Sequence, residues 1–166
     1  MRPVVRSDVQ DPDSVEDSCI SDCLTYWRGQ QGEAFAPRWT DFHLHELPSR
    51  TLPYILVLDV VGEPPEYVYR YWGSGHTQYH QRDYTGKKLT DMADAWSADL
   101  LTRQYNAVRD ARRPVVFLNS YEGVENPLKS LRMPLSEDGA KVTHLVSFVG
   151  RQNVSESLKP LFSARA

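Results

Sequence analysis

The sequence predicts an α+β fold with one five-stranded antiparallel sheet, helices on one face of that sheet and an amphipathic helix near the N-terminus. Two clusters of β-rich runs carry most of this prediction, two runs before Gly73 and three after Pro114. Each cluster contains a turn short enough for a hairpin, and hairpins pair strands in the antiparallel sense. Glycine-broken polar turns and a helical period lie between the clusters, and an apolar stripe at helical spacing precedes both.

The composition is that of one globular domain. The chain has 166 residues, of which 40% are hydrophobic and 25% charged, so it can bury a core without disulfides or metals. Its net charge of −3 gives no field that would gather nucleic acid or an anionic membrane. No apolar run approaches the roughly 20 residues that cross a bilayer. We therefore expect a cytoplasmic protein with no nucleic-acid or membrane partner.

The domain is expected to occupy residues 13–153. Residues 1–12 show no apolar period and are predicted to form a flexible leader. Residues 154–166 are predicted to form a weakly structured tail. The sequence contains no internal repeat that would divide the domain further.

The first predicted helix starts at Asp13, where Glu16 three residues later completes a capping-box-like pattern. Gly29 and Gly32 are expected to end it. We predict that its apolar stripe serves a homodimer contact; if the helix packs only on its own sheet, the protein could be a monomer. The stripe has the i, i+3, i+4, i+7 spacing of one helix face and consists of Ile20, Cys23, Leu24 and Trp27.

The chain has two cysteines, Cys19 and Cys23, which lie four residues apart in this helix. Two cysteines are too few for a disulfide framework. Buried packing and a redox pair both remain open for them.

Residues 54–61 are apolar on both faces, which is typical of a strand that is covered on both sides. The later helices would supply one cover and the N-terminal helix the other. A turn at residues 62–65 leads into a second strand at residues 66–72, so a hairpin is the economical interpretation.

Between the strand clusters, residues 74–94 form a broken polar pattern in which Leu89 and Met92 are the expected apolar anchors. Residues 97–112 predict a second long helix, capped by Ser97 and stopped before Pro114. One face of this helix carries Leu101, Tyr105, Val108 and Arg112.

Three strands are expected after this helix, at residues 115–121, 128–135 and 142–149. Residues 137–139, Glu-Asp-Gly, supply the turn between the last two. The middle strand has the period-two pattern of a half-buried strand, in which Leu131, Met133 and Leu135 alternate with Ser130, Arg132 and Pro134.

The order of these elements resembles the PAS fold, and local motifs agree with it. Residues 83–91, D-Y-T-G-K-K-L-T-D, are similar to the PAS turn before its short central helices. Residues 134–139, P-L-S-E-D-G, and the strand after them resemble the closing PAS hairpin.

More narrowly, the chain resembles a bacterial family of small stand-alone PAS-like proteins. The shared features are W-R-x-x-x-G at residues 27–32, the segment at residues 37–39, R-Y-W-G at residues 70–73, and the P-L-S-E-D-G turn, preceded here by Met133 where a leucine is expected. The resemblance covers about residues 23–150.

This resemblance implies a non-catalytic sensory or regulatory module that signals through protein–protein interaction. Its output would pass to a separate signalling protein in trans, and a small ligand would bind between the sheet and the helices. The resemblance supplies no catalytic residue, so we expect no enzymatic activity. The alternative is a pure protein-interaction adaptor whose core is filled by side chains.

The ligand and any cofactor stay unassigned, although the residues argue against haem and flavin. The C-x-x-C-H attachment motif is absent, and residues 97–112 contain no histidine that could be an axial haem ligand. Flavin photochemistry requires a cysteine near the ring in the central helices, whereas both cysteines lie in the N-terminal helix.

The candidate ligand-binding residues are Arg70, Trp72, His76 and Tyr105. Arg70 lies in the middle of a strand, where a cation must be paired or must meet an anion. Strict alternation places Arg70 and Trp72 on one face, so we predict that Arg70 binds a carboxylate or phosphate beside Trp72 and Tyr105. The alternative is a structural salt bridge between Arg70 and Asp59.

A metal-dependent enzyme is a further alternative, and it would use His76 and His80 together with a carboxylate. His43 and His45 have the spacing to lie on one side of a strand. Zinc requires three or four converging ligands, and the carboxylates near these histidines are ordinary loop residues. The sequence therefore favours no metal site.

Overall fold

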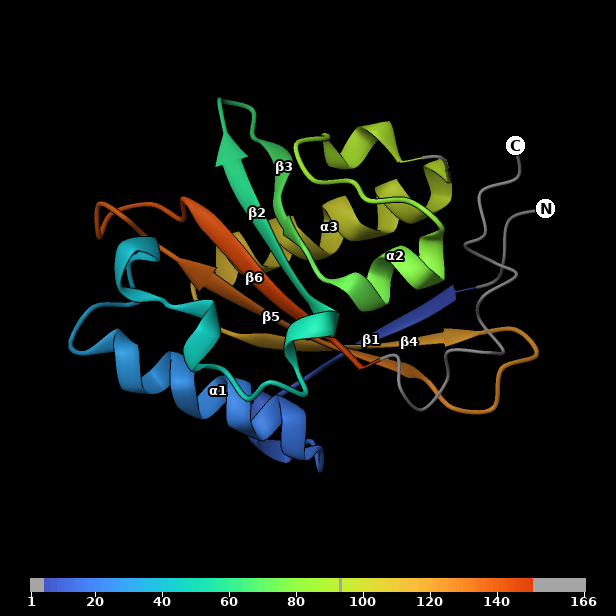
Figure 1. Cartoon of the computed structure of the whole chain (residues 1–166), viewed down its shortest axis with the longest axis horizontal. Coiled ribbons are helices and arrows are strands. Elements are labelled where there is room, and N and C mark those ends of the chain that lie inside the picture. Colours follow the sequence, from blue (N-terminus) through green and yellow to red (C-terminus); the bar gives the residue numbers. More distant parts are fainter. Residues whose placement is uncertain (1–4, 93, 151–166) are drawn as a thin grey trace.

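The computed structural model describes residues 5–92 and 94–150. It shows one antiparallel sheet with the strand order β1-β4-β5-β6-β2-β3. Helix α1 packs against one face of this sheet, and α2 and α3 lie on the other face (Figure 1). The strands are β1 Val5–Gln10, β2 Ile55–Val61, β3 Glu66–Trp72, β4 Val115–Tyr121, β5 Leu128–Leu135 and β6 His144–Val149, and the helices are α1 Ser18–Gln31, α2 Ser74–His80 and α3 Ala95–Ala111.

The class is the expected α+β, but the sheet has six strands where the sequence predicts five. The additional strand, β1, pairs in antiparallel register with β4 at the sheet edge, with Ser7 opposite Asn119. The prediction of a flexible leader is therefore wrong for residues 5–10. This strand lacks an apolar period because none of residues 6–10 is fully buried on either face, and Val9 is 66% exposed. The predicted tail at residues 154–166 lies outside the described residues.

Helix α1 begins later than the sequence predicts. Its N-cap is Asp17, whose carboxylate accepts a hydrogen bond from the Ile20 amide at 3.0 Å. Asp13 instead lies in the short helix η1, Pro12–Ser14, and forms a two-bond ion pair with Arg28 at 2.8 Å. The capping-box pattern at Asp13 therefore lies four residues before the actual N-cap, Asp17.

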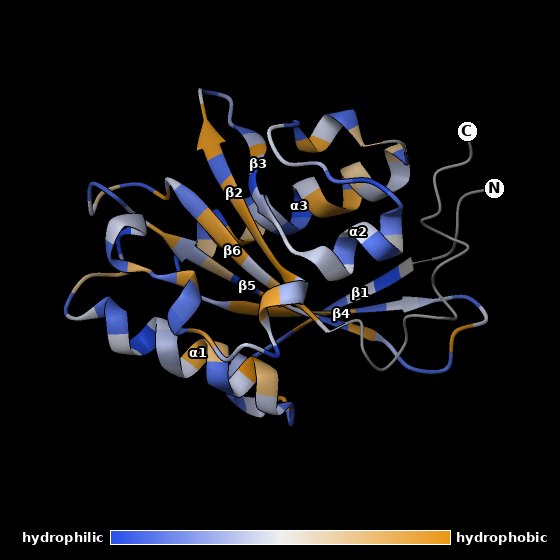
Figure 2. Ribbon diagram, in the orientation of Figure 1, coloured by the Kyte–Doolittle hydropathy of each residue, from blue (hydrophilic) through white to orange (hydrophobic). Residues whose placement is uncertain are grey.

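Each face of the sheet has its own apolar core. Under α1, the helix stripe packs with Val57, Met133 and Phe148. On the opposite face, α3 and the segment after α2 pack on Leu58 and Leu145. Strand β2 contributes to both cores and is almost continuously apolar, as its colour in Figure 2 shows. The expectation of cover on both sides is confirmed for residues 55–58, which are all buried, but not for the end of the strand, where Val61 is 49% exposed.

The half-buried pattern predicted for β5 is wrong, because α3 covers the face that carries its polar residues. Leu131, Met133 and Leu135 are buried under α1, as expected. Ser130 and Arg132 on the other face are each 1% exposed. The helix therefore encloses a cation and a hydroxyl group within the domain.

The connection between β3 and α2 passes very close to the segment before β2. The Gly73 amide donates to the Ile55 carbonyl at 2.9 Å. A Cβ atom at Gly73 would lie 2.4 Å from the Pro53 carbonyl oxygen, so only glycine fits there. This contact fixes where α2 begins.

After α2, the chain returns along the outer edge of β3. The Gly86 amide donates to the Tyr69 carbonyl at 2.7 Å, and the Tyr69 amide donates to the Lys87 carbonyl at 3.0 Å. Leu89, in the short helix η5 (Leu89–Asp91), and Met92 are buried as predicted. None of the helices in the described ranges combines the length and apolarity needed to cross a membrane.

Candidate ligand-binding cavity

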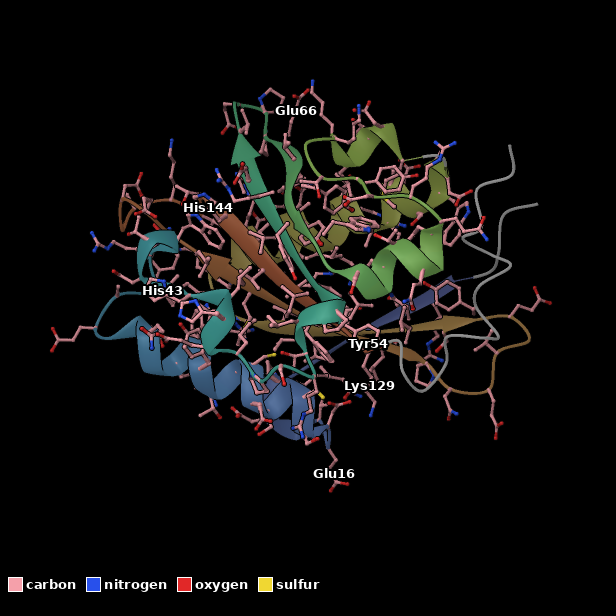
Figure 3. The ribbon with its side chains drawn as sticks, in the orientation of Figure 1. Glu16, His43, Tyr54, Glu66, Lys129 and His144 are labelled. Carbon is pink, nitrogen blue, oxygen red and sulfur yellow. The ribbon has the colours of Figure 1, made fainter. Side chains whose placement is uncertain are left out.

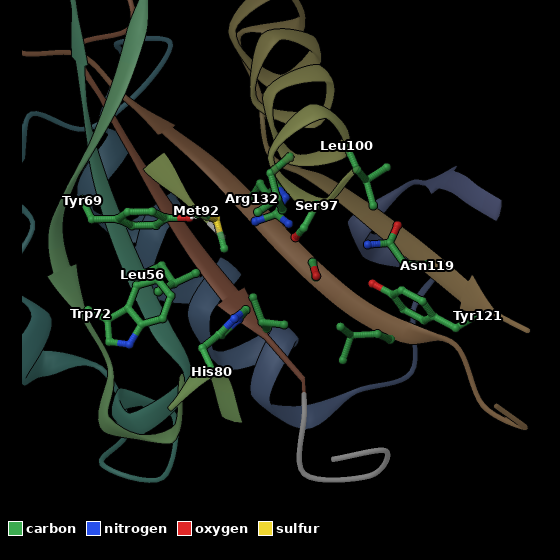
Figure 4. Close-up of a pocket in the computed structure, with 14 residues that line it drawn as sticks. Leu56, Tyr69, Trp72, His80, Met92, Ser97, Leu100, Asn119, Tyr121 and Arg132 are labelled. Atoms are coloured by element: carbon green, nitrogen blue, oxygen red, sulfur yellow. Dashed lines mark hydrogen bonds between the residues drawn. The ribbon is translucent and has the colours of Figure 1, made fainter. Parts of the chain in front are cut away.

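A cavity lies between the sheet and the layer formed by α2, η5 and the first turns of α3 (Figure 4). Its volume is about 30 Å³, which holds about two water molecules because one needs roughly 10–15 Å³. Its walls come from both strand clusters predicted in the sequence. The lining residues are Leu56, Tyr69, Trp72, His80, Met92, Ser97, Leu100, Leu101, Asn119, Tyr121, Leu128, Ser130, Arg132 and Val149.

Arg132 is the principal charged residue of this cavity. It projects from the middle of β5 toward α3 and is 1% exposed. Its Nε donates to Gln104 Oε1 at 2.9 Å, and its Nη1 donates to Tyr105 Oη and to Ser147 Oγ, both at 2.9 Å. Its Cζ lies 4.6 Å from the centroid of the Tyr105 ring. Every one of these partners is neutral.

No salt bridge in the described part of the chain involves Arg132. Its hydrogen bonds there use Nε and Nη1, and none uses Nη2. A buried cation is costly unless it is paired, and neutral hydrogen bonds offset only part of that cost. The arginine is therefore held in position by neutral groups, and no side chain of residues 5–92 and 94–150 compensates its positive charge.

Two further polar atoms at the cavity have no hydrogen-bond partner among residues 5–92 and 94–150. They are Ser130 Oγ and Trp72 Nε1, each with almost no solvent-accessible area. Buried polar groups are usually satisfied, so unpaired ones require an explanation, such as a missing ligand. Ser130 precedes Arg132 by two residues on β5, so both side chains leave the same face of the sheet.

Gln104 connects the cavity to the edge of the sheet. Its Oε1 accepts from Arg132, and its Nε2 donates to Asn119 Oδ1 at 2.9 Å and to Ser7 Oγ at 3.0 Å. A single amide thus links β5 through α3 to β4 and β1. This chain of contacts connects Arg132 to the edge strand β1.

Of the four ligand-binding residues predicted from the sequence, one lines the cavity directly. Trp72 does so, and its ring contacts the His80 ring at a centroid distance of 5.4 Å. Tyr105 is buried and reaches the cavity indirectly through Arg132. His76 is also buried and packs edge-on against the Tyr54 and Trp72 rings, behind the cavity wall.

Arg70 does not line the cavity, which corrects the predicted face assignment. The pairing of β2 with β3 shifts register between Val57 and Leu58, so Arg70 is an extra residue in β3. This bulge places Trp72 on the same face as Tyr69, within the core under α3. Arg70 is turned outward, with its side chain 46% exposed and its Nε 2.6 Å from Asp59 Oδ1. The salt bridge held open as the alternative is therefore present.

The helix stripe predicted as a dimer contact lies inside the chain's own core. The side chains of Ile20, Cys23, Leu24 and Trp27 are 0–3% exposed. Trp27 Nε1 also donates to the Pro134 carbonyl at 2.8 Å, which fixes α1 to the end of β5. These residues have no surface left for a second copy, so their assignment as a dimer contact is corrected.

The two cysteines of α1 differ in their surroundings. Cys19 is partly exposed, whereas Cys23 is fully buried, and both are free thiols. Burial raises the pKa of the Cys23 thiol to about 12. A thiol with such a pKa is almost never a thiolate near neutral pH, so Cys23 is a packing residue rather than a nucleophile.

The histidines considered as metal ligands are dispersed. His43 and His45 lie among the short helices after α1, and Figure 3 shows His43 well away from α2, where His76 and His80 lie. Within the described ranges, no three histidine, cysteine, aspartate or glutamate side chains come together as a metal site would require.

Sequence reasoning missed Arg132, the central residue of the cavity. The rule applied to Arg70, that a mid-strand cation needs a partner, holds equally for Arg132. The available signal was the pair of polar residues Gln104 and Tyr105 on the inner face of the predicted helix.

Comparisons with family models, curated proteins and solved structures found no match to this chain.

Proposed function

We propose that this protein is a non-catalytic, cytoplasmic PAS-type sensory module. It binds a small ligand in the cavity between the sheet and α2 and α3, and it passes the signal to a separate protein in trans. The observation that carries this proposal is the cavity itself: among residues 5–92 and 94–150, Ser130 Oγ and Trp72 Nε1 have no hydrogen-bond partner, and the buried Arg132 has no acidic partner. The α+β architecture is consistent with a PAS-like class.

The mechanism follows from the size of the cavity. At about 30 Å³ it is too small for a ligand of several heavy atoms, so such a ligand would displace part of the cover formed by α2 and residues 81–92. A ligand shifts a conformational equilibrium only by its difference in affinity for the two states. The ligand fits only when the cover is displaced, so its affinity differs between the closed and the open state. The Gln104 contacts offer a route from the cavity to β1.

The small volume also favours a second candidate. A protein-interaction adaptor would keep this fold, leave the cavity to ordered water and bind partners through its outer surface. Two such waters could satisfy Ser130 and Trp72 without any ligand.

Native mass spectrometry compared with denaturing mass spectrometry of the freshly purified chain distinguishes these candidates. The sensory proposal predicts a mass that is lost on denaturation, and that mass identifies the chemical class of the ligand. Bare spectra in both conditions, together with no binding in a small-molecule screen, would support the adaptor instead. The native spectrum also shows whether the chain is a monomer or a homodimer.

A further inference from the structure

We infer that the cavity is a site for a small organic monoacid, whose carboxylate binds to Arg132 and whose apolar body lies against the aromatic wall. This inference rests on the proposed function, because it assumes that a ligand enters this cavity. It adds the chemical class of the ligand and the residues that select it.

The charge balance of the cavity is the first argument. Arg132 is 1% exposed and its partners are an amide, a phenol and a hydroxyl group. None of the lining residues is an aspartate or a glutamate. A guanidinium cannot escape this cost by losing its proton, because arginine stays protonated in proteins. An anion in the cavity would supply the missing countercharge.

The arrangement of donors is the second argument. A guanidinium presents its N–H groups in a fixed planar geometry, and each of them can donate a charge-assisted hydrogen bond to a carboxylate oxygen. Here Nε and Nη1 are occupied within the described part of the chain, so Nη2 is the edge that can still bind a ligand. Ser130 Oγ and Trp72 Nε1 add two unpaired donors at the same cavity. In the described part of the chain, these donors have no partner and the cavity lining has no acid, so the site favours an acceptor-rich group.

The remaining walls indicate what the acid carries. They are mainly apolar and aromatic, and Figure 4 shows Trp72, Leu56 and Met92 on one side of Arg132 and Leu100 and Tyr121 on the other. Besides Arg132, the one titratable nitrogen in the lining is that of His80, which is 5% exposed. One cation matches one negative charge, so a monocarboxylate fits better than a phosphate or a dicarboxylate.

A purely structural role for Arg132 would predict a different environment for its side chain. An arginine retained only for stability would be expected to pair with a carboxylate or with backbone carbonyls, and to have its N–H groups satisfied. Arg70 provides that comparison within this protein, because it is half-exposed and bound to Asp59. Arg132 has the opposite environment, which is the pattern of a preorganised binding group.

The test uses the full chain and matched pairs of probes. Sodium butyrate and sodium benzoate are titrated by calorimetry at constant ionic strength, each beside its neutral amide, butyramide or benzamide. We expect at least one carboxylate to bind, and its amide to bind at least about tenfold more weakly, since a charge-assisted hydrogen bond is lost. Arg132→Met should remove carboxylate binding. Arg70→Met, the same substitution outside the cavity, should leave it within about twofold.

Thermal unfolding of the ligand-free variants separates binding from structure. Arg132→Met removes an uncompensated buried charge, so its Tm should equal or exceed that of the wild type. A folded variant with a lower Tm, combined with no carboxylate binding by the wild type, would show that Arg132 is structural. If Arg132→Met does not fold, Arg132→Lys keeps the charge but not the fixed planar N–H geometry that Gln104, Tyr105 and Ser147 hold in place, and it should bind the carboxylate about tenfold more weakly than the wild type.

The outcomes distinguish this inference from the function on which it rests. Equal binding of carboxylate and amide, or binding that survives in Arg132→Met, would overturn the anion site while leaving a ligand-binding module. Binding of none of the four probes would overturn the monoacid inference. If the native mass spectra also showed no bound ligand, the proposed sensory function would be refuted as well.

Discussion

Replacing Gly73 by alanine should destabilise the fold strongly, because this residue sits where β3 turns into α2. A Cβ atom there would lie 2.4 Å from Pro53 O, 2.7 Å from Pro53 C and 2.8 Å from Ile55 O. All three are backbone atoms, so no flexible side chain can move aside. The Gly73 backbone, at φ −61° and ψ 143°, is open to alanine, so the cost is purely steric.

The expected magnitude follows from that geometry. Overpacking typically costs about 1–3 kcal/mol, and alanine recovers about 0.4–1 kcal/mol by restricting the unfolded chain. With three backbone contacts to relieve, we take the upper end of the overpacking range and expect a net loss of about 2 kcal/mol in the free energy of unfolding. The strain would also shift α2, whose last residue, His80, lines the cavity.

Gly29→Ala is the matched control. Gly29 lies within α1, and no atom lies within 4 Å of the position its Cβ would take. Alanine there should raise the free energy of unfolding by about 0.5–1 kcal/mol. The same chemical change thus has opposite signs at the two sites.

Urea unfolding followed by circular dichroism measures both variants, and linear extrapolation gives the free energies. The m-values should match that of the wild type if the native and unfolded states are otherwise unchanged. A Gly73→Ala protein within about 0.5 kcal/mol of the wild type would refute the close approach of α2 to the segment before β2.

Three further predictions test the core and the sheet edge. Under native conditions at pH 8, a thiol reagent should label Cys19 but reach Cys23 only on unfolding, because burial raises the Cys23 pKa to about 12; equal labelling rates would contradict this. Burial lowers the pKa of His144 below 6.5, so the unfolded chain binds more protons than the folded one and the free energy of unfolding should fall as pH decreases below 6.5. In urea unfolding, His144→Gln should reduce this dependence of stability on pH. An unchanged dependence in the variant would contradict the role of His144. Trp27→Phe leaves the Pro134 carbonyl without its 2.8 Å donor and should cost about 1–3 kcal/mol in the same assay; no loss would mean that water replaces the indole.

The strands were the most predictable part of this molecule. The ranges 66–72, 115–121 and 128–135 coincide with β3, β4 and β5. The runs 66–72 and 115–121 are rich in β-branched or aromatic residues, whereas 128–135 contains neither and is predicted from its period-two alternation. Each run ends at a glycine or a polar turn, so the local pattern and the tertiary structure agree. An element can be predicted from sequence where local preference and tertiary packing favour the same structure.

Strand β1 could not be recognised because its structure depends on a distant partner. Val5–Gln10 alternates charged and apolar residues weakly, and its hydrogen bonds come from β4, more than 100 residues later. Edge strands bury little apolar surface, so they leave a faint pattern. The start of α1 was missed for a different reason: Asp13 and Asp17 both have a side chain that can cap a helix, and packing selected the second.

The two mid-strand arginines show why the site was harder to predict than the fold. Period-two alternation fails at Arg70 because a single extra residue reverses the faces after it. Alternation holds at Arg132, but the polar face of β5 is covered by α3 instead of solvent. Both outcomes depend on contacts between elements, which the pattern within one strand does not contain.

The most direct test of the account is a crystal structure of the full chain grown with whichever of butyrate or benzoate binds more tightly. The account predicts a carboxylate within hydrogen-bonding distance of Arg132 Nη2 and Ser130 Oγ, with its apolar part against Trp72 and with α2 moved outward to make room. A carboxylate bound elsewhere, or Arg132 paired with an acidic side chain of its own chain, would contradict the central claim that this cavity selects a small organic acid.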